Sequence, residues 1–289
     1  MINAQYLNIS PPEKAIPMSA RNVAVYHDGV KLLGRILLPG FDNEEEKAPV
    51  VLLLHGFPGH EKFDDLAQAL RRCGFVVFRT GFAGCWGSGG NYRFSTLTED
   101  LKANLQYLLD NADELHADTG RIFLIGHSMG GLTVLRALAD GLQVKGACLL
   151  APCNLAQRLE EEEEKFDGVF AKALDFIATP NGTIEDLKQD LQGRLEDWRF
   201  EQLAARIAIE LPLLFVGGSR DGVCPPVTHM NRAVSVLKAR GAQVTAVELD
   251  SDHSFQDQRP ELIETVVSWL IKRDAEMRKM HTMKGFSVY

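Results

Sequence analysis

Short apolar runs alternate with amphipathic stretches along most of the chain, starting at Val50. The runs have the length of buried strands, and the stretches between them repeat apolar residues at helical spacing. The predicted strands are 50–54, 74–79, 122–125, 144–151, 211–216 and 244–249. The predicted helices are 62–72, 97–109, 131–140, 227–240 and 260–273. Such alternation predicts right-handed crossovers, and therefore an α/β fold with a mostly parallel sheet.

Two further β-rich runs precede this pattern. Residues 23–26 and 31–38 flank the sequence His27-Asp28-Gly29, and an Asp-Gly turn between two such runs is typical of a tight hairpin. We therefore expect an antiparallel hairpin ahead of the parallel strands, which gives a sheet of eight strands.

The alternation stops between residues 153 and 206, where the chain is charged and helix-prone. The acidic run 160–164 is interpreted as one solvated helix face. Because no repeat or low-complexity linker divides the chain, the prediction is a single domain over residues 1–289 with a helical cap inserted at 153–206. Ligands bind at the carboxyl ends of the strands in open α/β folds, so a cap there would shape the substrate pocket.

Composition narrows the classes of partner. Apolar residues make up 45% and charged residues 24% of the chain, which is typical of a globular protein. The net charge of −8 disfavours nucleic acid or an anionic membrane as partner, because both require clustered Lys and Arg. The sequence has neither the pattern of a secretion signal nor an apolar run long enough for a membrane span, so a cytoplasmic location is expected.

The five cysteines are scattered and form no Cys-x-x-Cys pair. This pattern predicts reduced thiols and argues against a zinc site, and no other metal-ligand spacing is found. No metal and no cofactor are therefore expected. Cys224 is singled out for oxidation sensitivity, because it lies close in sequence to a candidate catalytic aspartate.

Residues 121–131 join a predicted strand to a predicted helix through Gly126-His127-Ser128-Met129-Gly130. A serine at such a corner is typical of a hydrolase nucleophile. The flanking glycines would let backbones approach closely while the turn holds Ser128 in a strained conformation. The alternative is a plain glycine-rich turn with an idle serine.

A serine hydroxyl needs a histidine to accept its proton and a carboxylate to orient that histidine. Asp221 and His253 each follow one of the last two predicted strands, so both are expected at the same sheet edge as Ser128. Asp250 and Asp252 compete for the acid role, but a carboxylate so near His253 in sequence is poorly placed to reach its Nδ1. The predicted triad is Ser128, His253 and Asp221.

Catalysis by this triad also requires donors for the oxyanion. Met129 offers a backbone N–H at the start of a predicted helix, and Phe57 offers one from the loop after strand 50–54, since Pro58 has none.

Two other groups of residues are assigned ordinary roles. Segment 81–90 is rich in glycine but lacks the Lys-Ser/Thr ending of a P-loop, so it is expected to be an irregular active-site loop with Trp86 near the pocket. His116, His229 and His281 are expected on the surface.

These blocks resemble the α/β-hydrolase family in order and spacing over nearly the whole chain. The matching motifs are His55-Gly56-Phe57, Gly126-His127-Ser128-Met129-Gly130, Gly218-Ser219-Arg220-Asp221 and Asp252-His253. Within the family, the hairpin, segment 79–90 and the modest cap resemble both cinnamoyl/feruloyl esterase-like carboxylesterases and the catalytic domain of prolyl-oligopeptidase-type acyl-peptide hydrolases. The resemblance implies acyl transfer to water through an acyl-enzyme.

The leading hypothesis is a serine carboxylesterase that acts on a small ester or a short acyl-peptide. Oligopeptidases of this type usually carry a large β-propeller before the catalytic domain, and too few residues precede Val50 for one, which favours the esterase. A serine peptidase and a thioesterase or lysophospholipase-like enzyme stay open as alternatives, because function resides in the pocket rather than the fold. A non-catalytic ligand-binding relative is the hypothesis from another class. The oligomeric state is left open, with a homo-oligomer as one option.

Overall fold

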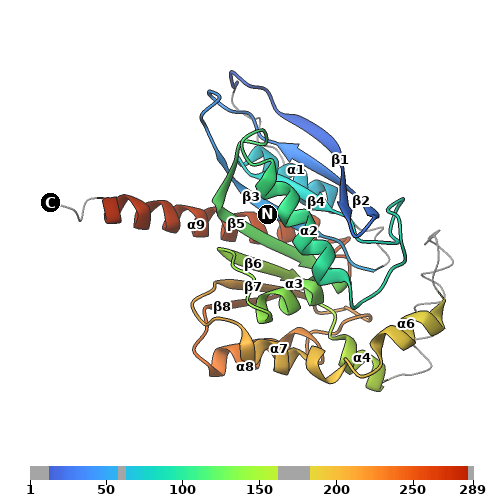
Figure 1. Cartoon of the computed structure of the whole chain (residues 1–289). Coiled ribbons are helices and arrows are strands. Elements are labelled where there is room, and N and C mark those ends of the chain that lie inside the picture. Colours follow the sequence, from blue (N-terminus) through green and yellow to red (C-terminus); the bar gives the residue numbers. More distant parts are fainter. Residues whose placement is uncertain (1–12, 58–62, 162–182, 286–289) are drawn as a thin grey trace.

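The computed structural model describes residues 13–57, 63–161 and 183–285 (Figure 1). In this part of the chain, eight strands form one sheet in the order β1-β2-β4-β3-β5-β6-β7-β8. The strands are β1 (Ser19–His27), β2 (Val30–Leu38), β3 (Ala48–Leu54), β4 (Val76–Thr80), β5 (Ala117–His127), β6 (Gly146–Leu150), β7 (Leu213–Gly218) and β8 (Val244–Leu249). The β1–β2 hairpin is antiparallel and joins β4 in antiparallel fashion, whereas β3 to β8 run parallel to one another. The predicted sheet and its hairpin are confirmed.

Helices cover both faces of the sheet, which explains why the central strands are apolar without interruption. Along β3, Val50 and Leu52 belong to one buried cluster, and Val51 and Leu53 belong to the other. Helices α1 (Asp64–Arg72) and α9 (Arg259–Gly285) pack on the second cluster. The first cluster is covered by α2 (Leu97–Asp110), α3 (Met129–Ala139) and α8 (Met230–Ala239) (Figure 1).

The described part of the connection from β6 to β7 consists of short helices joined by turns and irregular segments. It contains α4 (Leu155–Glu161), α6 (Ile184–Leu191), the short 3-10 helix η1 (Glu196–Trp198) and α7 (Phe200–Arg206). Residues 162–182, which include most of the acidic run, lie outside the described residues. That this connection forms a cap over the active site stays a prediction.

Two contacts attach the connection to the body of the domain. The Asp190 carboxylate accepts hydrogen bonds from the backbone N–H and the hydroxyl of Ser95. The Arg136 guanidinium lies 3.9 Å from the centre of the Trp198 ring and donates to the carbonyl oxygen of Phe94. The connection is therefore held against α3 and the segment that precedes α2.

Two boundaries differ from the sequence-based expectation. Strand β5 begins at Ala117 because this residue pairs with Ala48 across an irregularity in the β3–β5 ladder. Helix α9 continues past residue 273 to Gly285. Just past residue 273, the Asp274 carboxylate accepts hydrogen bonds from Arg121 of β5 at 2.9 and 3.1 Å. No helix in the described residues combines the length and apolarity needed to cross a membrane.

Candidate active site

Ser128 occupies a sharp corner between β5 and α3. Its backbone has φ 52° and ψ −113°, a conformation that L residues rarely adopt, and its side chain is buried. A Cβ at Gly126 would lie 2.3 Å from the Gly130 carbonyl oxygen, and a Cβ at Gly130 would lie 2.5 Å from that of Leu54. The close backbone approach and the strain that the sequence predicts are both present.

Asp221 and His253 are in direct contact at the carboxyl ends of β7 and β8. Asp221 Oδ2 lies 2.7 Å from His253 Nδ1, and Asp221 Oδ1 accepts hydrogen bonds from the backbone N–H groups of Val223 and Cys224, each at 2.7 Å. Burial alone would raise the pKa of Asp221, but the hydrogen bond and charge of His253 and the two N–H donors together lower it. Asp221 is therefore ionised at neutral pH and can hold a proton on His253 Nδ1.

The competing carboxylates are engaged elsewhere. Asp250 accepts a hydrogen bond from Arg220 Nε at 2.8 Å, and Asp252 accepts from the backbone N–H groups of Ser254 and Gln256. Asp221 is the carboxylate that the structure brings to His253.

His127, which directly precedes Ser128, contacts the loop that carries His253. Its Nε2 lies 2.9 Å from the His253 carbonyl oxygen, and the two imidazole rings are 4.9 Å apart. Burial lowers the pKa of His127 well below its usual value, so the ring is neutral and Nε2 carries the proton that it donates. Sequence reasoning missed this contact, because the residue before the nucleophile carries no motif that signals it.

The third link of the predicted triad is not formed as a hydrogen bond. Within the described residues, the Ser128 hydroxyl makes no hydrogen bond to His253. Catalytic hydrogen bonds in ligand-free enzymes often tighten only when substrate binds. The serine-to-histidine proton transfer is therefore still a prediction.

The loop after β3 lies against Ser128. A Cβ at Gly56 would come within 2.9 Å of Ser128 Cβ, which places the next residue, Phe57, beside the serine. Met129 is the first residue of α3, where backbone N–H groups lack acceptors within the helix. The Phe57 ring packs 4.8 Å from that of the buried Tyr92, so this loop is held against the aromatic part of the core.

A cavity of about 270 Å³ opens at the carboxyl ends of β3 and β4, next to this loop. His55, Thr80, Cys85 and Trp86 contribute to its wall, and Ser128 is not among its described lining residues. Trp86 is 49% exposed and has a positive φ, in a segment of turns and bends. Segment 81–90 is thus an irregular loop, as expected.

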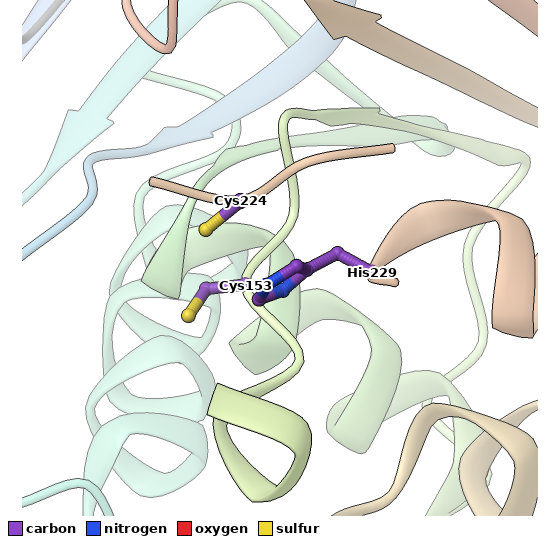
Figure 2. Close-up of side chains that lie close together, drawn as sticks. All are labelled: Cys153, Cys224 and His229. Atoms are coloured by element: carbon purple, nitrogen blue, oxygen red, sulfur yellow. The ribbon is translucent and has the colours of Figure 1, made fainter. Parts of the chain in front are cut away.

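A group of two thiols and one imidazole lies next to Asp221. Cys153, Cys224 and His229 converge from separate segments, and their ligand-type atoms all lie within 4.8 Å of one another (Figure 2). The expectation that His229 is a surface residue is wrong, because it is only 1% exposed. Cys153 and Cys224 are far apart in sequence but close in space, because each follows one of the adjacent strands β6 and β7.

A parallel sheet with an N-terminal hairpin, a strained serine corner and an acid–histidine pair at the carboxyl edge together define an α/β-hydrolase. A family model described as serine aminopeptidase, S33 (Hydrolase_4) matches residues 45–192, just over half of the 289 residues. The chain belongs to this family, and the sequence-based assignment to the hydrolases is confirmed at the family level.

Individual relatives are more distant. The medium-chain fatty acyl-CoA hydrolase precursor of Anas platyrhynchos is 27% identical over 66% of this chain and 35% of its own length. The chain spans between about a third and a half of the first curated relatives that it matches.

Two solved structures share the fold. Est1E from Butyrivibrio proteoclasticus has a TM-score of 0.62 and 20% identity, over 88% of this chain and 99% of its own. The Pyrococcus horikoshii acylaminoacyl peptidase has a TM-score of 0.68 and 18% identity, over 90% of this chain and 42% of its own.

The packing at the serine corner predicts a large cost for Gly130→Ala. The new Cβ would meet the carbonyl oxygens of Leu54 and His55 at 2.5 and 2.7 Å, and backbone atoms cannot move aside as a side chain can. We expect the free energy of unfolding, measured by urea denaturation, to fall by about 2–3 kcal/mol. Gly222→Ala is the matched control, since a Cβ at Gly222 meets nothing within 4 Å. Equal stability of the two variants would contradict this packing.

Proposed function

We propose that the chain is a serine carboxylesterase, and the contact between Asp221 and His253 beside the strained Ser128 corner is the observation that carries the proposal. In this mechanism, Ser128 attacks the acyl carbon of an ester, and the backbone N–H groups of Phe57 and Met129 bind the oxyanion.

Proton transfer follows from the electrostatics of the pair. The ionised Asp221 keeps a proton on His253 Nδ1, so Nε2 is left to accept the proton of the Ser128 hydroxyl. His253 then donates this proton to the leaving alkoxide as the tetrahedral intermediate collapses to the acyl-enzyme. A water molecule, activated by the same Nε2, hydrolyses the acyl-enzyme and frees the carboxylic acid.

Two observations favour an ester with an apolar acyl group. The aromatic rings of Phe57, Tyr92 and Phe94 pack together next to the proposed oxyanion loop, with centroid distances of 4.8 to 6.2 Å. The names of several relatives also denote acyl ester or thioester hydrolysis, namely a fatty acyl-CoA hydrolase, monoglyceride lipases and an esterase. A peptidase of the acylaminoacyl type is the second candidate, supported by the family description and by structures of that name.

Replacing the nucleophile is the first experiment. We expect Ser128→Ala to reduce turnover of p-nitrophenyl acetate to the uncatalysed background and to abolish labelling by a fluorophosphonate, because only an activated serine reacts with this probe. Circular dichroism would verify that the variant is folded. Undiminished turnover or labelling would exclude Ser128 as the nucleophile.

The acid role can be tested against a neighbouring carboxylate. We expect Asp221→Asn to lower kcat by about 10⁴-fold, because the neutral amide no longer stabilises the required His253 tautomer or the imidazolium. Asp250→Asn is the control, since Asp250 forms an exposed ion pair with Arg220, and it should keep kcat within about twofold. A larger loss in the control than in Asp221→Asn would reassign the acid.

Substrate class is tested with paired leaving groups. We expect the wild-type chain to hydrolyse short acyl esters. Its rate of hydrolysis of acyl-alanyl and aminoacyl p-nitroanilides should be no higher than that of Ser128→Ala. The measurement is initial rate over a substrate panel. Anilide cleavage that depends on Ser128 would place the peptidase first.

A further inference from the structure

The cluster of Cys153, Cys224 and His229 is a built arrangement rather than a chance approach of surface groups. The three residues are 3%, 2% and 1% exposed, respectively. Cys153 follows β6, Cys224 lies in the loop from β7 to α8, and His229 directly precedes α8. Figure 2 shows that the three side chains approach one another from three separate segments of the chain.

The donor set suits a thiophilic cation. Two thiolates and one imidazole are ligands preferred by Zn²⁺ and its softer analogue Cd²⁺. In a tetrahedral zinc site with Zn–S bonds of about 2.3 Å, two sulfur ligands are about 3.8 Å apart. The ligand atoms here lie within 4.8 Å, so each pair would need to close by no more than about 1 Å.

His229 Nδ1 already acts as an acceptor in this structure. The backbone N–H of Asn154 donates a hydrogen bond to His229 Nδ1 at 2.8 Å, which requires an unprotonated Nδ1 and a neutral ring. A cation that takes this lone pair would replace the Asn154 hydrogen bond. Coordination by both cysteines would release two protons to solvent, and a divalent ion with two thiolates has no net charge, so its burial is not prohibitive.

A second observation comes from the same segment. The Asn154 side chain is fully buried, yet neither its amide oxygen nor its amide nitrogen has a hydrogen-bond partner. Buried polar side chains nearly always have hydrogen-bond partners. The Asn154 amide, next to Cys153 in sequence, therefore offers a donor and an acceptor that no described protein group meets.

The cluster is connected to two residues of the proposed triad through backbone hydrogen bonds. The N–H of Cys153 donates to the Ser128 carbonyl oxygen at 3.0 Å, and the N–H of Cys224 donates to the Asp221 carboxylate at 2.7 Å. We propose that Cys153, Cys224 and His229 bind one thiophilic divalent cation, and that its binding displaces Ser128 and Asp221 and inhibits hydrolysis. The inhibition clause rests on the proposed esterase function, whereas the binding clause does not.

Binding is tested on the full chain, reduced and freed of metal, by titration with Cd²⁺. We expect one Cd²⁺ per chain, seen by the ultraviolet cadmium–thiolate charge-transfer band, and the release of about two protons per chain, measured in weakly buffered solution. Cys153→Ser and Cys224→Ser should each abolish the stoichiometric band, whereas Cys73→Ser, which removes a cysteine outside the cluster, should retain it. Because the proton release is measured on the wild-type chain, an unfolded variant would not obscure the result. A wild-type chain without the band, or a band that survives both cluster substitutions, would overturn the site.

Inhibition is measured separately, on ester turnover. At saturating Cd²⁺ we expect the wild-type rate to fall by at least about tenfold and to recover on chelation, since displacements of about 1 Å in a catalytic site can cost more than this. The rate of Cys224→Ser should not respond to Cd²⁺. Stoichiometric binding with an unchanged rate would refute the inhibition clause alone, and a chain without esterase activity would refute the proposed function while the charge-transfer band still reports the site.

Discussion

The backbone of Ser128 is the constraint on which the active-site edge depends. Its N–H donates to the Leu150 carbonyl oxygen at the end of β6, and its own carbonyl oxygen accepts from Gly131, Leu132 and Cys153. A positive φ of 52° is unfavourable for a serine, and these hydrogen bonds keep Ser128 in that conformation. Because β3, β5 and β6 are adjacent and parallel, the same corner sets the distance from Ser128 to the loop after β3 and to the segment that carries Cys153.

The sequence predicts the features that depend on local pattern. The apolar runs identify the strands, since a strand buried on both faces is mostly apolar, and the glycines at 126 and 130 identify a corner where a Cβ would meet backbone atoms. The positions of Asp221 and His253 after consecutive strands were sufficient to bring them together, because the carboxyl ends of parallel strands share one edge.

Features that depend on packing between distant segments could not be predicted in this way. His229 precedes an amphipathic helix, and nothing in its neighbours indicates that Asn154 would offer it a buried donor. The contact from His127 to the His253 carbonyl oxygen could not be predicted either, because the residue before the serine of such a motif can be of many types. The predicted end of α9 was too early, since the ion pair between Asp274, just past residue 273, and Arg121 of β5 forms only in the folded sheet.

Residues of the β6–β7 connection contact the body of the domain next to Phe94. The Asp190 carboxylate accepts hydrogen bonds from the backbone N–H and the hydroxyl of Ser95. Arg136 of α3 stacks on Trp198 and donates to the Phe94 carbonyl oxygen. Burial lowers the pKa of Arg136 to about 10, and its cationic form is still the one present at neutral pH, so both contacts hold under ordinary conditions. Phe94 also packs on Tyr92 and Phe57 beside the proposed oxyanion loop. Movement of the part of the connection that carries Asp190 and Trp198 would therefore act on the aromatic side chains proposed to meet the acyl group, whereas Cys153, at the start of the same connection, contacts Ser128 directly through its backbone N–H.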